Sequence, residues 1–321
     1  MRISLSMCKH SPFLPQFPRI GKVHCRQPPK EKVVVVMGAT GTGKSRLSID
    51  IATRFPSEIV NSDKMQVYEG LDITTNKITR EEACGVPHHL LGVVDPNIDF
   101  TAKNFCTMAS LAIKSVVSNR RLPIVVGGSN SFIEALIDDK DNKFRSKYEC
   151  CFLWVDVSTH VLDSFLSDRV DQMVERGMVN EVRNMFRLNA DYSGGLRRAI
   201  GVRELDRYFR AESSSNDETR ARILEEAINM IKFNTSKLAC RQVEKIYRLR
   251  DVKGWEVHRI DATNVFKKRG KEANNAWESM VARPSTAIVS RFLYNFCPME
   301  GRNLRAMRAP LMETAVAAAT H

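Results

Sequence analysis

The chain has 321 residues, of which 43% are hydrophobic and 27% charged, and its formal net charge is +12. This is the composition of a globular protein with ample core for one large or two modest domains. No apolar run approaches the roughly 20 residues that a membrane-spanning helix requires, so we expect no membrane partner. The eight cysteines show no C-x-x-C spacing, which argues against a zinc site or a disulfide framework.

The positive charge is concentrated at the start of the chain. Residues 1–32 carry seven Lys or Arg residues and one acidic residue, which accounts for half of the net charge. The mildly basic remainder favours small phosphorylated substrates over a duplex-binding surface. Residues 1–31 are also rich in Pro and Ser, and a basic, hydroxylated, almost acid-free segment is typical of an organelle transit peptide. A disordered tail is the alternative interpretation.

A phosphate-binding loop follows this segment. The β-branched run Val33–Val36 leads into Gly38–Ser45, which matches G-x-x-x-x-G-K-S, and a helical pattern continues to Arg54. Glycines let the backbone curl so that its N–H groups face an anion, and the following helix adds further free donors. Lys44 supplies a charge for the outer phosphate, and the Ser45 hydroxyl can ligate Mg²⁺. The residues that we expect to contact phosphate are Gly38, Ala39, Thr40, Gly41, Thr42, Gly43, Lys44 and Ser45.

Strand and helix patterns alternate after the loop. The segments that predict strands are 57–63, 122–126 and 152–157, and those that predict helices are 102–121, 159–187 and 217–250. This alternation predicts an α/β fold, a P-loop-type and mostly parallel sheet flanked by helices, with a smaller helical region that covers the substrate. Residues 227–250 also carry six Lys or Arg residues. A solvated basic face is the simpler interpretation, and phosphate contacts are the alternative.

Two polar features lie between the loop and the long helices. Asp63 ends the second predicted strand, and open α/β sheets bind ligands at the carboxyl ends of their strands. It could therefore meet whatever the loop holds, or it could cap a turn. His88-His89 lie in a loop-rich segment. A metal role would need further ligands at suitable spacing, so we expect ordinary loop histidines.

We expect three regions along the chain. Residues 1–31 form the transit segment or tail, residues 32–265 the P-loop core with its helical part at about 159–250, and residues 266–321 a C-terminal extension. The hydrophobic pattern weakens after residue 265, and residues 302–321 end in an Ala-rich tail that we expect to be mobile.

Several blocks in the same order resemble the isopentenyltransferases, the family that includes tRNA dimethylallyltransferases and the adenylate isopentenyltransferases of cytokinin synthesis. The similarity runs from about residue 33 to 250, and the plant adenylate enzymes are the most similar group. The matching blocks are 38–45, 61–77, 86–90, 121–129, 169–173 and 198–204.

The resemblance implies a role for the loop and for Asp63. In this family the loop grips the diphosphate of the prenyl donor, dimethylallyl diphosphate, and the acid after the second strand is the general base on the adenine N6 amino group. Asp63 is at the matching position. Thr40 matches the threonine whose hydroxyl reaches the bridging oxygen of the leaving group. Lys44 and Mg²⁺ on Ser45 would stabilise the departing diphosphate.

Further residues in the matching blocks are candidates for substrate contacts. Arg203 and Lys237 fall in basic blocks, and we expect them to contact the diphosphate. Lys64 replaces the serine that follows the catalytic acid in the tRNA enzymes. It would keep Asp63 ionised if close, or it would reach the phosphates of the acceptor. The remaining candidates for lining the nucleotide or prenyl pocket are Thr75, Asn76 and Ser129.

The predicted acceptor is a free adenine nucleotide, AMP, ADP or ATP. The tRNA-modifying members carry a long helical insertion after the Gly-Gly block, whereas only residues 130–151 separate this block from the next predicted strand. No zinc-finger spacing occurs after residue 250. We therefore expect no tRNA partner.

The sequence leaves two alternative functions, and it also leads to expectations about oligomeric state and location in the cell. A P-loop kinase of small metabolites would explain the loop and Asp63 but not the other blocks, and a tRNA dimethylallyltransferase is the second alternative. The resemblance favours the plastid, with the cytoplasm or the mitochondrion as alternative locations. We expect the protein to be a monomer.

Overall fold

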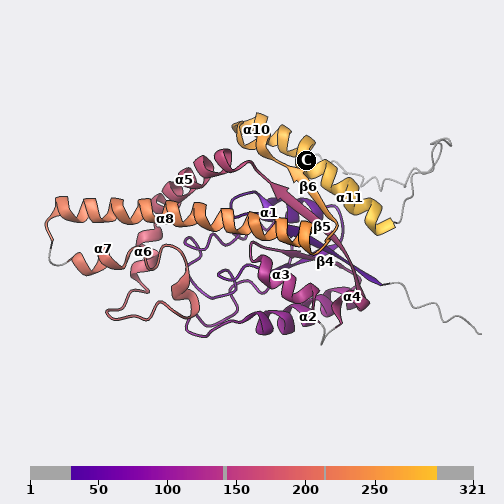
Figure 1. Ribbon diagram of the computed structural model, residues 1–321, viewed down its shortest axis with the longest axis horizontal. Coiled ribbons are helices and arrows are strands. Elements are labelled where there is room, and N and C mark those ends of the chain that lie inside the picture. Colours follow the sequence, from indigo (N-terminus) through magenta and orange to yellow (C-terminus); the bar gives the residue numbers. More distant parts are fainter. Residues whose placement is uncertain (1–29, 140–142, 213–214, 295–321) are drawn as a thin grey trace, which may run out of the picture.

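The structure is a computed structural model that describes residues 30–139, 143–212 and 215–294 (Figure 1). Within these residues the centre is a sheet of six parallel strands in the order β3-β2-β4-β1-β5-β6. The strands are β1 (Glu31–Met37), β2 (Ser57–Asn61), β3 (His88–His89), β4 (Leu122–Val126), β5 (Tyr148–Asp156) and β6 (Val257–Asp261). The expected α/β fold is confirmed. The tail at 302–321 and nearly all of the expected transit segment lie outside the described residues.

The central strands are buried on both faces because their side chains alternate between two hydrophobic cores. On β1, Val33 and Val35 belong to one core, Val34 and Val36 belong to the other, and all four side chains are fully buried. A continuous β-branched run is the pattern of a parallel strand that is covered on both sides. The run that predicts a strand before the phosphate loop therefore forms the centre of the sheet.

Helices cover both faces of the sheet. The first core receives α2 (Ala102–Ser118), α3 (Asn130–Ile137) and much of α8 (Asp217–Tyr247). The second core receives α1 (Lys44–Ala52), α10 (Gly270–Trp277) and α11 (Arg283–Tyr294). The first half of α8 extends beyond the sheet beside α7 (Asp206–Ala211) (Figure 1). The other elements are α4 (Phe144–Lys147), α5 (Thr159–Glu175), α6 (Met178–Arg183), α9 (Thr263–Phe266) and the short helices Gly195–Arg198, Arg248–Val252 and Glu278–Ala282.

The structure differs from the expected elements where the sequence pattern is weak. Gly177, at φ 100°, divides the predicted helix over 159–187 into α5 and α6. Two edge strands are not predicted, since β3 has two residues and β6 buries only Ile260. After residue 265, where the pattern weakens, the described residues nevertheless form α10 and α11 on the second core.

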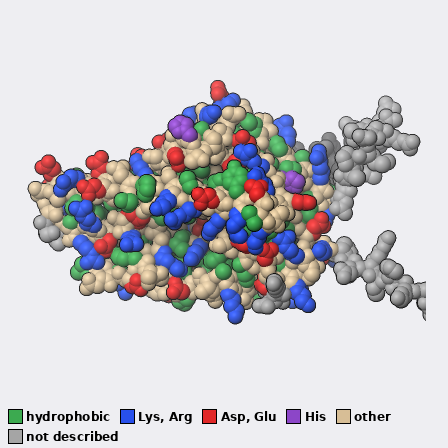
Figure 2. Space-filling view, viewed as in Figure 1, with side chains coloured by type: hydrophobic (Ala, Val, Ile, Leu, Met, Phe, Trp, Pro, Cys, Tyr) green, Lys and Arg blue, Asp and Glu red, His purple; other side chains and the backbone are tan. Residues whose placement is uncertain are grey.

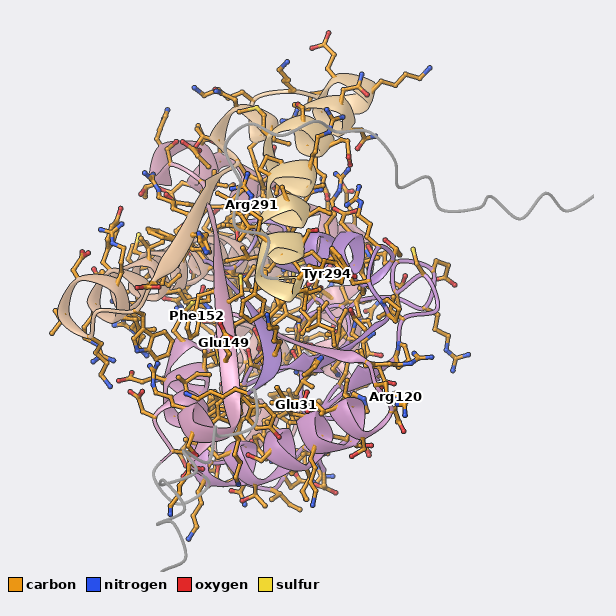
Figure 3. The ribbon with its side chains drawn as sticks, turned by 90° about the vertical axis from the view of Figure 1, so that its right-hand side faces the viewer. Glu31, Arg120, Glu149, Phe152, Arg291 and Tyr294 are labelled. Carbon is orange, nitrogen blue, oxygen red and sulfur yellow. The ribbon has the colours of Figure 1, made fainter. Side chains whose placement is uncertain are left out.

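The helix α11 lies at the amino end of the sheet. Lys32 at the start of β1 donates a hydrogen bond to the Leu293 carbonyl at 3.3 Å, and its ammonium lies 4.9 Å from the centre of the Phe292 ring. Figure 3 views the molecule from this side, with Glu31 at the start of β1 and Tyr294 at the end of α11. The carboxyl ends of the strands face the opposite way, and the loops there form the candidate site.

Candidate active site

Three neighbouring strands end at the candidate active site. The strand β1 leads to the phosphate loop Gly38–Ser45, β4 to Gly127–Ser129, and β2 to Asp63. Because β4 lies between β2 and β1 in the sheet, the Gly127–Ser129 turn lies between Asp63 and the loop. The carboxyl ends of adjacent parallel strands are the usual place for a ligand in an α/β sheet. The topology therefore brings together segments that are far apart in the chain.

Three helices hold the phosphate loop. The Thr40 backbone N–H donates to Gln242 Oε1 on α8 at 2.7 Å, and the Thr40 hydroxyl accepts a hydrogen bond from Arg169 on α5 at 3.3 Å. Gly43 adopts φ 89°, and a Cβ at this position would lie 2.6 Å from the indole ring of Trp277 on α10. This conformation and this close approach together require glycine.

Lys44 is folded back onto the loop that carries it. Its ammonium donates a hydrogen bond to the Ala39 carbonyl at 2.6 Å. Burial lowers the pKa of Lys44 to about 8 against the attraction of Asp63, and Arg169 adds a smaller lowering effect. Since the ammonium is poorly solvated and lies near a second cation, a phosphate group in the loop would stabilise its charge.

The carboxylate of Asp63 is fixed through one oxygen. Asp63 Oδ1 accepts hydrogen bonds from the backbone N–H groups of Met65 at 2.9 Å and Gln66 at 3.4 Å. Asp63 Oδ2 takes part in neither bond, and a Cβ on Gly128 would lie 3.6 Å from it. The two interpretations of Asp63 are therefore compatible, because one oxygen caps the turn and the other is left for a ligand.

A cavity of about 550 Å³ lies beside Asp63 and the phosphate loop, and Thr40 is the loop residue that lines it. Thr40, Asp63 and Arg169 line it together with the Gly128-Ser129 turn. Figure 2 shows Lys and Arg side chains, with acidic side chains among them, on the face of the molecule that α8 crosses. An apolar wall beside a few convergent polar groups is the usual form of a small-molecule site. The apolar lining residues from α5 and α8 are Leu166, Val170, Met173, Ile231 and Leu238.

A second cavity of about 430 Å³ adjoins the first, and Arg198 and Arg241 line both. Arg203 and Lys237 line this second cavity and do not belong to the lining of the first. The structure therefore places the two expected diphosphate ligands beside Arg198 and Arg241, away from the phosphate loop.

Lys64 belongs to a group of cations at the first cavity. Burial lowers the pKa of Lys64, Arg198 lowers it further, Asp99 opposes this effect, and Lys245 adds to it. Lys64, Arg198 and Lys245 all line the cavity. Positive charges that are held together in a concave site attract anions strongly.

The weaker candidates divide into two groups. Thr75 and Ser129 line the first cavity, whereas Asn76 lies outside its lining. Asn76 adopts φ 51°, and its carbonyl accepts a hydrogen bond from Gln66 Nε2 at 3.0 Å. Asn76 thus shapes the turn beside the cavity.

Two site residues escaped the sequence reasoning, Arg169 and Gln242. Arg169 falls within a block that matches the isopentenyltransferases, so that block could have directed attention to it. Gln242 is a buried glutamine within a basic helix, and no pattern in the sequence distinguishes it.

Two further predicted features are the magnesium ligand Ser45 and the histidine pair His88-His89. Ser45 is exposed at the start of α1, directly after Lys44. His89 Nε2 lies 2.6 Å from Glu58 Oε2. In the described part of the chain, no three His, Cys, Asp or Glu side chains converge as a metal-binding group.

None of the described helices is long and apolar enough to cross a membrane.

Comparison with protein families identifies the class to which this site belongs. The model of the IPP transferase family matches residues 66–146 and 139–247. The chain belongs to the IPP transferase family and is a prenyltransferase. The family predicted from the matching blocks is confirmed.

Within that family, the chain is highly similar to adenylate isopentenyltransferases. One such enzyme of Arabidopsis thaliana, named chloroplastic, is 59% identical over 99% of this chain and 96% of its own length. Another from the same plant, named mitochondrial, is 51% identical over 92% of this chain and 91% of its own length.

A solved structure has the same fold at lower identity. It is that of a eukaryotic dimethylallyltransferase acting on tRNA, with a TM-score of 0.69 and 25% identity over 88% of this chain and 82% of that chain. Since the tRNA enzyme and this chain share the fold, the fold alone does not select the acceptor.

Proposed function

We propose that the protein transfers the dimethylallyl group of dimethylallyl diphosphate to N6 of the adenine in a free adenine nucleotide, which is the first step of cytokinin biosynthesis. The observation that carries this proposal is the shared cavity, which Asp63 and the loop residue Thr40 line together. The high identity to enzymes named adenylate isopentenyltransferase supports the same reaction.

The phosphate loop would hold the diphosphate of the donor. The loop N–H groups and the dipole of α1 supply a preorganised positive potential, and Arg169 and Lys44 add full charges. A diphosphate would replace the Ala39 carbonyl as the partner of the Lys44 ammonium and keep it protonated. The Thr40 hydroxyl, which Arg169 holds, would donate a hydrogen bond to the bridging oxygen as the C–O bond of the donor breaks.

Asp63 would act as the general base on the acceptor. The N6 amine is a weak nucleophile because its lone pair is delocalised into the purine ring, so removal of its proton assists the attack. Asp63 Oδ2 would take this proton, while Oδ1 keeps its bonds to the backbone of Met65 and Gln66. The N6–C bond forms, the C–O bond of the donor breaks, and diphosphate leaves with the electron pair.

Ser45 at the start of α1 is the residue that would hold a magnesium ion. Mg²⁺ needs few protein ligands where phosphate oxygens and water complete its octahedral shell, and the exposed Ser45 hydroxyl would be the protein ligand. When bound, the ion would neutralise charge on the departing diphosphate.

The cationic group Lys64, Arg198 and Lys245 would attract the phosphates of the acceptor nucleotide. The second cavity, with Arg203 and Lys237, would receive the more distant phosphates of ADP or ATP. This division assigns one set of cations to each substrate, with Lys44 and Arg169 at the donor.

The connection after Ser129 favours a free nucleotide over tRNA. Among the described residues, only the short helices α3 and α4 lie between this turn and β5. The long insertion that we associate with tRNA-modifying members has no room in this connection. We therefore propose AMP, ADP or ATP as the acceptor and no tRNA partner.

Incubation of the full-length protein with Mg²⁺, dimethylallyl diphosphate and one of four acceptors tests the proposal. The acceptors are AMP, ADP, ATP and unmodified tRNA, and mass spectrometry identifies the products. We expect one prenyl group on a free nucleotide, no product when Mg²⁺ is chelated, and phosphoryl transfer in no case. A prenyl group on tRNA alone would contradict the assignment of the acceptor.

We also propose that the protein works as a monomer in the plastid. The plastid part of this proposal is supported by a similar relative that is named chloroplastic. Light scattering should give the mass of one chain, and a C-terminal fluorescent fusion should accumulate in plastids. A fusion found in mitochondria would contradict the plastid location and would match the relative that is named mitochondrial.

A further inference from the structure

Gln242 connects the two halves of the candidate active site. Its side chain is 7% exposed, and Gln242 Oε1 accepts a hydrogen bond from the Thr40 N–H at 2.7 Å. Gln242 Nε2 donates to the Gly128 carbonyl at 2.9 Å, and the backbone carbonyl of Gln242 accepts from Asn130 Nδ2 at 2.9 Å. One residue of α8 is thus bonded both to the phosphate loop after β1 and to the turn after β4.

The partners of Gln242 lie next to the groups that we expect to react. The Thr40 hydroxyl accepts a hydrogen bond from Arg169 at the donor side. On the acceptor side, a Cβ on Gly128 would lie 2.4 Å from Gln242 Nε2 and 3.6 Å from Asp63 Oδ2. The amide of Gln242 therefore fills the space between the phosphate loop and the turn beside Asp63. A change in its position would change the separation of Thr40 and Asp63.

The amide group is chemically specific for this position. It offers an acceptor to the Thr40 N–H and a donor to the Gly128 carbonyl at the same time. A glutamate would turn a second acceptor towards the Gly128 carbonyl. A methionine of similar length would leave a buried donor and a buried acceptor without their partner. The packing of α8 does not depend on this amide, since Ile231, Ala239 and Ile246 bury the helix in the two cores.

We propose that Gln242 is a positioning residue that sets the distance between the leaving diphosphate and the acceptor amine. The inference rests on the prenyl transfer proposed above. At the correct distance, N6 attacks as the C–O bond of the donor breaks. At a longer distance, water attacks the same carbon, which gives dimethylallyl alcohol, diphosphate and a proton. Gln242 therefore controls the share of donor that reaches the nucleotide.

Four full-length variants test this role. Gln242→Met removes both side-chain bonds, and Gln242→Glu keeps an acceptor for Thr40 but loses the donor to Gly128. Gln172→Met and Gln172→Glu make the same changes at an exposed glutamine on α5. Mass spectrometry measures prenylated AMP and dimethylallyl alcohol in the same reaction. Steady-state kinetics give kcat and KM for both substrates.

We expect Gln242→Met to lower the kcat of prenyl transfer by about 10²-fold, as a displacement of about 1 Å can do. Both KM values should stay within roughly threefold, because the substrate-binding charges are unchanged. The share of donor released as alcohol should rise. Gln242→Glu should show the same changes to a smaller extent, and the two Gln172 variants should behave as wild type.

Three results would overturn the inference. The first is an unchanged kcat and product ratio in Gln242→Met. The second is a lower kcat that follows a lower melting temperature, with no extra alcohol, since this would indicate a purely structural role. The third is a wild-type protein that prenylates no nucleotide, which would contradict the proposed function as well. The first two results, with an active wild-type protein, would contradict this inference alone.

Discussion

The protonation state of Lys44 links binding of the donor to pH. Burial holds the pKa of Lys44 at about 8, so the ammonium loses its proton as the pH rises through this value. The phosphate loop then loses a full charge that would attract the diphosphate. The unfolded chain, with the ordinary pKa of 10.5, binds more protons between these two values, so the free energy of unfolding rises with pH over the same window.

We therefore expect kcat/KM for dimethylallyl diphosphate to fall as the pH rises above about 8. The pH profile of kcat/KM reports groups of the free enzyme, so it is the suitable measurement. Lys44→Met should lower kcat/KM at every pH and remove this basic limb. A wild-type profile that stays flat between pH 8 and the ordinary lysine pKa would contradict the assignment.

Arg169 should act through the geometry of its guanidinium as well as through its charge. It donates a hydrogen bond to the Thr40 hydroxyl at 3.3 Å, and Asp63 opposes the lowering of its pKa by burial. A lysine keeps the charge but lacks the planar fork of donors. We expect Arg169→Lys to lower kcat about tenfold, or roughly 1.4 kcal/mol of transition-state stabilisation, in steady-state assays.

The exposed Arg187 supplies the matched control for this substitution. Arg187→Lys should leave the kinetic constants unchanged. An Arg169→Lys variant with wild-type kcat would mean that charge alone matters at this position.

The sequence predicts where a residue lies in the fold when the signal is local. The phosphate loop and Asp63 each follow a buried strand directly, so their place at one edge of a parallel sheet could be expected. The contact between Thr40 and Gln242 joins residues 202 positions apart, and no local pattern encodes it. The sequence shows that Arg203 and Lys237 are basic but not how far they lie from the phosphate loop. That distance depends on how α8 crosses the site.

At the scale of elements, α10 braces the helix that follows the phosphate loop. Trp277 Nε1 donates to Asp50 Oδ2 at 2.6 Å, and just beyond the ends of the two helices Arg54 forms an ion pair with Glu278 at 2.9 Å. The Trp277 ring also lies against Gly43 in the loop itself. Part of the expected C-terminal extension thus supports the donor site. No clear hydrophobic pattern predicts this role, because α10 buries only Ala276 and Trp277.

Substitution of Trp277 should therefore affect both stability and donor binding. We expect Trp277→Leu to lower the free energy of unfolding by about 3 kcal/mol and to weaken binding of dimethylallyl diphosphate. Trp277→Phe keeps a ring against Gly43 and loses only the bond to Asp50, which should cost about 1 kcal/mol. Urea unfolding and calorimetric titration measure the two effects. Equal stability of Trp277→Leu and wild type would contradict the brace.

The second cavity should distinguish nucleotides by the length of their phosphate chain. Loss of both Arg203 and Lys237 removes two cations that line it. We expect the double variant Arg203→Ala, Lys237→Ala to raise KM for ADP and ATP about tenfold and KM for AMP much less, as charge-assisted contacts of this kind imply. Steady-state kinetics with each nucleotide check this expectation.

The exposed Arg207 on α7 serves as the control for charge, and Arg207→Ala should leave these constants unchanged. A rise in KM for dimethylallyl diphosphate, with no difference between the nucleotides, would contradict the division of the cations. That result would instead favour the first expectation, that Arg203 and Lys237 contact the diphosphate of the donor.

For the whole molecule, the fold could be predicted because the central strands carry continuous apolar runs such as Val33–Val36. The edge strands and the C-terminal helices could not, since few of their side chains are buried. The fold is shared with a tRNA-acting enzyme, so the choice of acceptor depends on local features. We propose that those features are the short connection after Ser129 and the cations of the two cavities.

The central claim is that Asp63 deprotonates the acceptor amine while the phosphate loop holds the donor. A single-turnover measurement with saturating AMP and dimethylallyl diphosphate, for wild type and Asp63→Asn, tests it most directly. The asparagine keeps an acceptor for the Met65 N–H, so the turn should survive. We predict that prenyl transfer slows by about 10²–10⁴-fold while the Kd for the donor is unchanged. A variant that transfers the prenyl group at the wild-type rate would contradict the account.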